Sequence, residues 1–203
     1  MAKITSLDQL KALYPNPTGR TLKKEMRRLD KHSRRFISLS PFLILGTVGP
    51  DGLGDVSPRG EAPGFVQVPD DQTLLIPDRP GNNRLDTLTN LLENPAIGIL
   101  FLIPGVNETL RINGIGEIRD DPELCSGFTV QGKQPRSVLL IRVQQAYLHC
   151  AKSLMRSKLW EDKSIVERSV LPTMGEMIND QTGEAGSPES QQDMIARYEK
   201  MFY

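Results

Sequence analysis

Three polar residues of one short segment are spaced so that they could bind a ligand together. Asp55, Ser57 and Arg59 occupy every second position, so on a β-strand their side chains would share one face. An arginine guanidinium can hold a phosphate through two parallel hydrogen bonds, and small polar side chains suit an uncharged part of the same ligand. We therefore expect this strand to face a bound molecule.

A second polar segment follows about twenty residues later. Arg79 and Arg84 flank the start of an expected helix, where free backbone N–H groups already favour an anion. Asn82 and Asn83 between them could add neutral hydrogen bonds to a polyol. The pattern predicts a phosphate site. Pro-Gly-Asn-Asn is also typical of an ordinary loop and helix cap, so both interpretations remain open.

Other motifs for catalysis are missing from the chain. It has no Gly-x-Ser-x-Gly turn, no His-Glu-x-x-His helix and no paired-cysteine zinc pattern. The chain has two histidines, His32 and His149, and two cysteines, Cys125 and Cys150, which leave little for a metal site, so we expect no metal. If the protein is an enzyme, a bound organic cofactor is the expected source of the reactive group.

The middle of the chain must supply the elements that position these residues. Short apolar or alternating segments predict strands, and leucines at helical spacing predict one helix among them, over residues 83–93. The expected strands cover residues 42–48, 55–59, 64–68, 73–77, 96–103, 109–119 and 137–149. Because strands and helices do not alternate, the pattern predicts an antiparallel barrel or sandwich and not a doubly wound sheet.

Helices are expected at both ends of the chain. Residues 6–13 suit a helix capped by Ser6, residues 21–36 an amphipathic basic helix, and the last forty residues helices separated by a linker at 183–188. This divides the chain into a helical extension (1–40), a barrel domain (41–160) and a C-terminal helical arm (161–203). The basic helix is either a solvated face, or it docks on the acidic arm or screens an anionic ligand.

Composition excludes several classes of protein. The 203 residues contain 25 basic and 25 acidic side chains, which argues against a nucleic-acid partner. The longest apolar stretch is far shorter than the roughly 20 residues needed to cross a membrane. No secretory signal is expected from the first residues, and two cysteines are too few for a disulfide framework. We therefore expect a cytoplasmic protein.

Several motifs in a fixed order resemble the pyridoxamine 5'-phosphate oxidase-related flavoproteins, and within them a subgroup carrying Asp-Val-Ser-Pro-Arg-Gly and a late His-Cys-x-Lys. They cover roughly residues 40–160. The motifs are Phe42-Leu-Ile-Leu-Gly-Thr-Val-Gly-Pro-Asp-Gly52, Asp55-Val-Ser-Pro-Arg-Gly60, Pro77-Asp-Arg-Pro-Gly-Asn-Asn-Arg84, Asn94-Pro95, Leu100-Phe101 and Glu108-Thr-Leu-Arg-Ile-Asn-Gly114.

The resemblance implies a mainly β fold with flanking helices, an antiparallel split β-barrel. It also implies a homodimer that holds two FMN molecules at the interface, each touching both subunits. By position, the strand against the flavin carries Ser57, Pro58, Arg59 and Gly60. Ile76 and Pro77 fall beside the ring. Asn83 and Arg84 take the place of the pair that holds the phosphate, but a longer segment leaves Arg79 as an alternative.

The remaining implied contacts lie late in the chain. Thr109 and Arg111 fall on the strand that reaches the polar edge of the flavin, and Lys152, Arg156 and Trp160 fall where relatives place contacts from the second subunit. The family's vitamin B6 oxidases end in an arginine and histidine motif that grips the substrate phosphate. The segment here is an acidic helix, so that activity is not expected to transfer.

The expected function is therefore that of an FMN-dependent oxidoreductase acting on a small molecule. The shape of the pocket decides which molecule this is, and the sequence does not reveal that shape. Two alternatives remain. One is a flavin carrier or sensor without catalysis. The other is a split barrel that uses deazaflavin F420 or haem, for which His149 is the candidate axial ligand.

Overall fold

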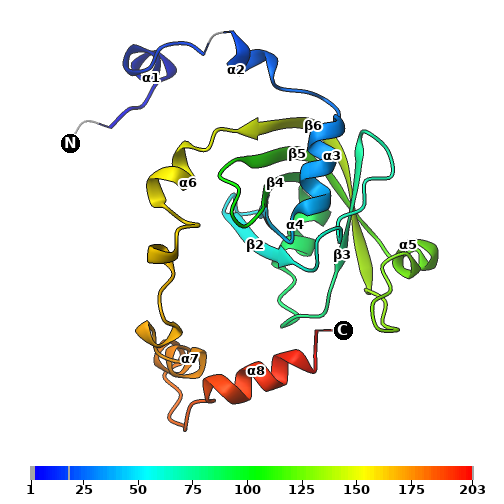
Figure 1. Ribbon diagram of the computed structural model, residues 1–203, viewed down its shortest axis with the longest axis vertical. Helices are drawn as coiled ribbons and strands as arrows, with labels where there is room; N and C mark the ends of the chain where they lie inside the picture. Colours follow the sequence, from blue (N-terminus) through cyan, green and yellow to red (C-terminus); the bar gives the residue numbers. More distant parts are fainter. Residues whose placement is uncertain (1–2, 18, 203) are drawn as a thin grey trace.

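The computed structural model describes residues 3–17 and 19–202, and its centre is a curled six-stranded antiparallel sheet (Figure 1). The strand order is β2-β1-β4-β5-β6-β3. An ion pair between the two edge strands, Arg59 of β2 and Asp78 of β3, joins them across the open seam of a half-barrel. The expected antiparallel split barrel is confirmed. The strands are β1 (Phe42–Val48), β2 (Gly54–Gly60), β3 (Thr73–Asp78), β4 (Ala96–Leu102), β5 (Thr109–Arg119) and β6 (Ser137–His149).

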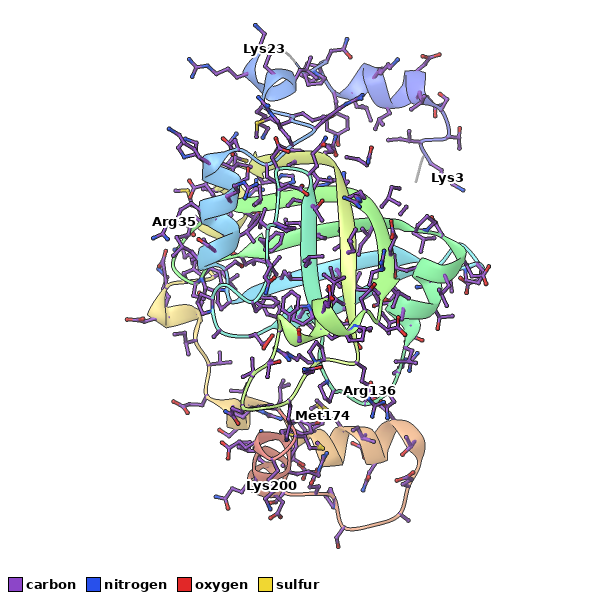
Figure 2. The ribbon with its side chains drawn as sticks, turned by 90° about the vertical axis from the view of Figure 1, so that its right-hand side faces the viewer. Lys3, Lys23, Arg35, Arg136, Met174 and Lys200 are labelled. Atoms are coloured by element: carbon purple, nitrogen blue, oxygen red, sulfur yellow. The ribbon has the colours of Figure 1, made fainter. Side chains whose placement is uncertain are left out.

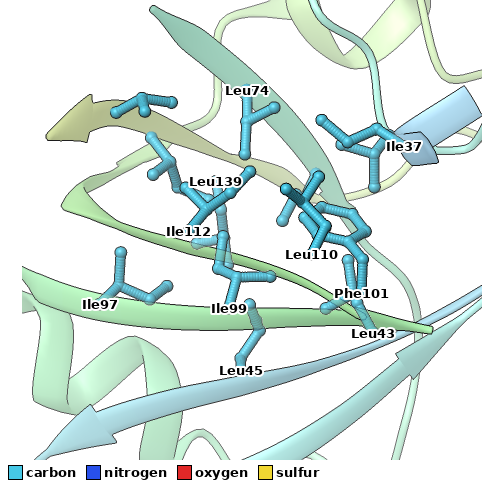
Figure 3. Packing of buried hydrophobic residues seen from close by; sticks show 14 of the residues in the cluster. Ile37, Leu43, Leu45, Leu74, Ile97, Ile99, Phe101, Leu110, Ile112 and Leu139 are labelled. Atoms are coloured by element: carbon cyan, nitrogen blue, oxygen red, sulfur yellow. The ribbon is translucent and has the colours of Figure 1, made fainter. Parts of the chain in front are cut away.

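Alternation along the strands builds the core. In β1 and β4 every second side chain is buried, and the buried set meets inside the barrel together with Leu110 and Ile112 of β5 (Figure 3). Ile37 from helix α3 (Lys31–Leu39) packs into the same cluster. The alternation follows from the two-residue period of a strand, which sends neighbouring side chains to opposite faces.

Three helices, α3, α4 (Asp86–Glu93) and α5 (Pro122–Ser126), pack against the strands of the barrel. Helix α3 packs on β5 and β6, and α4 packs on β1, β2 and β5. Helix α5 lies against β6 and helps to enclose a second, small apolar cluster that includes Cys125 and Phe128. The other helices are α1 (Leu7–Leu13), α2 (Arg20–Lys23), α6 (Lys152–Ser157), α7 (Met174–Thr182) and α8 (Gln191–Glu199).

The expected continuous basic helix over residues 21–36 is wrong. The structure breaks it between α2 and α3, where Met26 exchanges two backbone hydrogen bonds with Ala146 of β6 and the buried Leu29 donates its backbone N–H to Asp71. The Asp30 carboxylate then caps α3 by accepting from the backbone and the hydroxyl of Ser33. Pairing with the sheet and a strong N-cap outweigh the helical spacing of the apolar residues.

Two other expectations change in detail. Residues 64–68 do not form a strand; they contribute a single bridge, Gln67 to Leu75. The helix expected over 83–93 begins only at Asp86, because Asn83 has a left-handed backbone with φ of 57°. The strands expected at 42–48, 109–119 and 137–149 are found with these bounds, and Ser6 caps α1 as expected.

The helical ends of the chain lie at opposite ends of the molecule. Helices α1 and α2 are above the barrel and α7 and α8 below it in both views (Figures 1 and 2). The basic segment therefore does not dock on the acidic arm of its own chain. Among the helices described, none combines the length and the apolar character needed to cross a bilayer. Cys125 and Cys150 are both free thiols.

Candidate functional site

A groove of about 970 Å³ opens at the seam between the two edge strands. Strand β2 forms one wall, and the end of β3 with the segment that leads into α4 forms the other. Nine of the predicted site residues line it: Ser57, Pro58, Arg59, Gly60, Pro77, Arg79, Asn82, Asn83 and Arg84. The two polar segments of the sequence thus meet in one place.

Arg59 crosses the seam at the bottom of this groove. Its Nη1 atom donates to Asp78 Oδ1 over 2.6 Å, and both side chains are about four-fifths buried, with 20% and 18% of their surface exposed. The Arg59 Nε atom is buried and has no hydrogen-bond partner among the described residues. Since a buried unpaired donor is costly, an acceptor supplied by a ligand would stabilise this position.

Arg79 is held by a carboxylate that the sequence analysis did not single out. Its Nε atom donates to both oxygens of Glu61, over 3.1 and 3.0 Å, and its Nη2 atom lies 2.9 Å from Glu61 Oε2. Both side chains are largely buried. Glu61 neutralises the Arg79 charge, so this pair serves to fix the β3–α4 segment against the end of β2.

Arg84 lies at the exposed rim. It pairs with Asp86, whose hydrogen bond and charge raise the pKa of the guanidinium above its ordinary value. Asn82 Oδ1 accepts from the Arg84 backbone N–H, and Asn83 adopts the left-handed conformation of the turn. The asparagines thus make the loop that the alternative interpretation expected. This turn also presents Arg84 to solvent, where it can reach a ligand.

A buried polar network holds α4 against the sheet beside the groove. Asp55 Oδ2 accepts from the hydroxyl of Thr87 over 2.9 Å and from that of Thr47 over 3.3 Å, and Asn90 Nδ2 donates to Thr47 Oγ1 over 3.0 Å. Thr47, Thr87 and Asn90 are all buried. Asp55 therefore positions α4, and with it the rim that carries Arg84.

The other predicted residues do not line the groove of their own chain. The Ile76 side chain is fully buried in the core, and Thr109 is buried on β5. Trp160 donates its Nε1 hydrogen to the Val106 carbonyl over 2.9 Å. Arg111 on β5 and Lys152 and Arg156 on α6 are exposed.

Arg111 belongs to a second cluster, on the outer face of β5 and β6. Its guanidinium lies 5.7 Å from the centre of the Tyr147 ring, the Lys24 ammonium lies 5.2 Å from the same ring, and His149 stacks at a tilt 5.0 Å away. Burial, and then the charges of Lys24 and Arg111, lower the pKa of His149. The strand register, Arg111 opposite Tyr147 and Thr109 opposite His149, creates this cluster.

Sequence reasoning missed several groove residues. Asp78 and Glu61 carry the opposite charges of the two buried pairs, and Arg136 forms a further exposed cation just before β6. The exposed Arg136 makes no ion pair within residues 3–17 and 19–202. Only the fold brings this position to the groove, because β6 pairs with β3 at the seam.

The outer surface of β1 and β4 is apolar although it faces away from the core. Phe42 stands opposite Leu102, Ile44 opposite Leu100, and Gly46 opposite Gly98. These side chains are partly exposed, and the glycine pair leaves a flat place in the sheet. Such a face on a sheet is suited to contact with another protein surface.

This half-barrel with a groove at its seam is the architecture of a known class of proteins. The family model described as pyridoxamine 5'-phosphate oxidase matches residues 29–150, and the chain belongs to this family. Comparison with curated proteins gives no match.

Solved structures with the same fold include HupZ of Group A Streptococcus, seen in a histidine-to-alanine variant. It is 18% identical with a TM-score of 0.50, over 60% of this chain and 99% of that one. General Stress Protein 26 of Bacillus anthracis is 17% identical with a TM-score of 0.44, over 57% and 88% of the two chains. A structure described as F420 reductase is 20% identical with a TM-score of 0.41, over 57% and 94%.

Proposed function

We propose that the protein binds FMN in the seam groove, as a homodimer, and acts as a flavin-dependent oxidoreductase on a small organic molecule. Membership of the pyridoxamine 5'-phosphate oxidase family supports the cofactor class. The observation that carries the proposal is the buried Nε atom of Arg59, which has no hydrogen-bond partner among the described residues, in a groove large enough for a nucleotide-sized ligand.

The groove offers each kind of contact that FMN requires. Arg84 and Arg136 on its rim can hold the phosphate, since both are exposed and can turn toward an anion. Asn82, Asn83 and Ser57 suit the hydroxyl chain. Both arginines pair with a carboxylate, but the Arg79–Glu61 pair is largely buried, whereas the Arg84–Asp86 pair is exposed and can open to a ligand. We therefore assign the phosphate to Arg84 in preference to Arg79.

The ring would lie deeper, against the apolar part of the lining. Phe65, Pro77 and Leu88 line the groove and can exclude water from one side of a planar ring. Bound FMN would supply the redox-active ring that exchanges a hydride or electrons with a substrate. Arg59 would place its free Nε donor at a polar edge of the ring, and Asp78 would keep the guanidinium oriented.

A second subunit accounts for the predicted residues that lie outside the groove. Thr109, Arg111, Lys152, Arg156 and Trp160 cannot line the groove of their own chain, but relatives share each site between two subunits. The outer face of β1 and β4 supports such a dimer, because it is apolar and partly exposed in one chain. A partner as lid also suits a groove that is open on one side.

The true oxidase reaction on vitamin B6 is not proposed. Helix α8 carries only Arg197 with Lys200 following it as cations, and Arg197 is held by both oxygens of Glu189. Helix α8 therefore does not offer the phosphate grip of the B6 oxidases.

An absorbance spectrum of the purified protein, before and after addition of FMN and then of a nicotinamide reductant, tests the proposal. We expect flavin bands near full occupancy and their bleaching on reduction. A protein that stays colourless with FMN would refute flavin binding. Binding of deazaflavin F420 or haem instead would support the other cofactors, and stable flavin without turnover would support a carrier.

A further inference from the structure

Residues 164–202 include two helices in which no residue is buried. Helices α7 and α8 have no buried residue, and residues 161–170 before them are all exposed. Large apolar side chains are spread along this C-terminal arm, residues 161–203. The exposed ones include Ile165, Val166, Val170, Leu171, Ile178 and Ile195.

The arm is nonetheless built as a defined structure. Thr173 and Glu176 form a capping box at the start of α7, and Ser190 caps α8. Arg197 binds both oxygens of Glu189 over 2.9 and 2.7 Å. Specific caps and an ion pair distinguish these helices from a disordered tail, so their exposed apolar faces indicate a missing partner surface.

The N-terminal side of the chain has the opposite charge. The basic segment, residues 20–35, holds eight basic and two acidic side chains, whereas the arm holds nine acidic and four basic ones. Arg27 and Arg28 are exposed, and neither forms an ion pair with any residue that the structure describes. Helix α1, which precedes the basic segment, also buries no side chain.

These two complementary regions cannot meet within one chain as it is folded. The start of the basic segment, with α2, lies at one end of the barrel, its end, in α3, lies along the side of the barrel, and α7 and α8 lie at the opposite end (Figures 1 and 2). The segment just before the arm is held on the barrel, because Leu154 of α6 is buried and Trp160 donates a hydrogen bond to the Val106 carbonyl. In a two-fold dimer, a contact between the arm of one chain and the basic segment of the other forms twice.

We propose that the acidic C-terminal arm of each chain docks on the basic N-terminal segment of a second copy of the chain, so that the two subunits exchange arms. The charges select this pairing, and the apolar side chains of both regions supply the buried surface. This inference rests on the homodimer of the proposed function. It does not need the flavin, so arm exchange can fail while flavin binding holds.

Reversing the charges of one region at a time tests this pairing. The basic-reversed chain carries R27E, R28E and K31E. The acid-reversed chain carries D180K, E184K and E199K. All six side chains are exposed, and none of them forms an ion pair within the part of the chain that the structure describes. Matched controls reverse Lys133 and Glu93, exposed charges on the barrel.

Dimer dissociation constants from analytical ultracentrifugation are the readout, with the melting temperature and circular dichroism confirming the fold of each variant. Each reversed chain alone should dissociate at least about tenfold more readily than the natural protein, since like charges then face each other. An equimolar mixture of the two reversed chains should recover the affinity, because each arm then meets an opposite charge on its partner.

The mixture separates exchange from the alternatives. If only a chain carrying all six reversals recovers the affinity, and the mixture does not, the pairing is within one chain and the proposal is wrong. Unchanged dissociation of both reversed chains would also overturn it. Carbodiimide cross-linking of a mixture of nitrogen-14 and nitrogen-15 chains gives an independent answer: exchanged arms yield cross-linked peptides of mixed isotope, and cross-links of single isotope alone would contradict exchange.

Discussion

Arg59 shows how one side chain can serve both the fold and a ligand. It closes the seam through Asp78 and keeps one donor free for the groove. Arg59→Ala would leave the largely buried Asp78 carboxylate without its partner. We expect a loss of about 1–3 kcal/mol in the free energy of unfolding and a lower affinity for FMN. Urea unfolding and a flavin fluorescence titration measure the two effects.

Two further variants separate the roles. Arg59→Lys keeps the positive charge but loses the planar fork, so it should retain more stability than the alanine variant while still binding FMN weakly. Arg84→Ala removes an exposed cation, so it should lower FMN affinity and leave the unfolding free energy unchanged. Full flavin content in both the Arg59→Ala and Arg84→Ala proteins would refute the assignment of these residues.

His149 gives the molecule a pH-dependent stability. Burial, then Lys24 and Arg111, lower its pKa in the folded state, so at mildly acidic pH the unfolded chain binds more protons than the folded one. Stability should therefore be constant above the ordinary histidine pKa of about 6.5 and fall as pH drops below it. The melting temperature between pH 5 and 8 measures this slope.

His149→Gln should remove that part of the slope, because glutamine does not titrate. Lys24→Gln should shift the His149 titration, followed by NMR, back toward the ordinary value, since one repelling charge is gone. An unchanged titration in the Lys24 variant would show that the cluster does not act on the imidazole.

Sequence could predict the groove residues better than their partners. Asp55, Ser57 and Arg59 share a face through a two-residue period, which needs no knowledge of the fold. Asp78, Glu61 and Arg136 reach the same groove only through the seam between distant strands. Pairings of this kind depend on sheet order, and a local pattern carries no information about it.

At the scale of elements, α4 depends on polar and not only apolar contacts. Thr87 donates to Asp55 and is buried, whereas Thr89 on the same helix is exposed. Thr87→Val should lower the free energy of unfolding by about 1–3 kcal/mol, because the half-buried Asp55 carboxylate loses its shorter hydrogen bond. Thr89→Val is the matched control and should change it by less than about 0.5 kcal/mol in urea unfolding. Equal effects would show that Asp55 does not hold the helix.

A closely packed glycine lies at the register shift in the pairing of β5 with β6. A register shift occurs between Asn113 and Gly114, and a Cβ atom at Gly114 would lie 2.5 Å from the Arg142 carbonyl oxygen. Gly114→Ala should therefore destabilise the protein by about 1–3 kcal/mol or more, since backbone must move. Gly54→Ala in β2 meets no atom within 4 Å and serves as the control. Similar thermal unfolding of both variants would contradict the close approach.

Helix boundaries were harder to predict than strands. Strands β1, β5 and β6 have the bounds that alternation and apolar runs indicate. The basic helix fails because Met26 pairs with Ala146, more than a hundred residues away. A local helical spacing cannot anticipate that a sheet edge will capture the backbone.

At the scale of the whole molecule, we propose two separate dimer contacts, one through the barrel and one through the arm. The apolar face of β1 and β4 would join the barrels, and the exchanged arms would then tie the subunits at their ends. Only the first contact is needed to complete the groove with Arg111 and its neighbours. Loss of the barrel contact should therefore affect both dimerisation and flavin binding, whereas loss of the arm contact should affect dimerisation alone.

Leu100→Glu places a charge on the barrel face opposite Ile44, and Leu92→Glu places one on the exposed side of α4 as control. A carboxylate in an apolar interface is desolvated without a partner, so Leu100→Glu should dissociate the dimer and release flavin together. Deletion of the arm should weaken the dimer and leave the flavin of the remaining dimer in place. Sedimentation and flavin absorbance on the same samples separate these outcomes. Retained flavin in a monomeric Leu100→Glu protein would show that one chain alone completes the site.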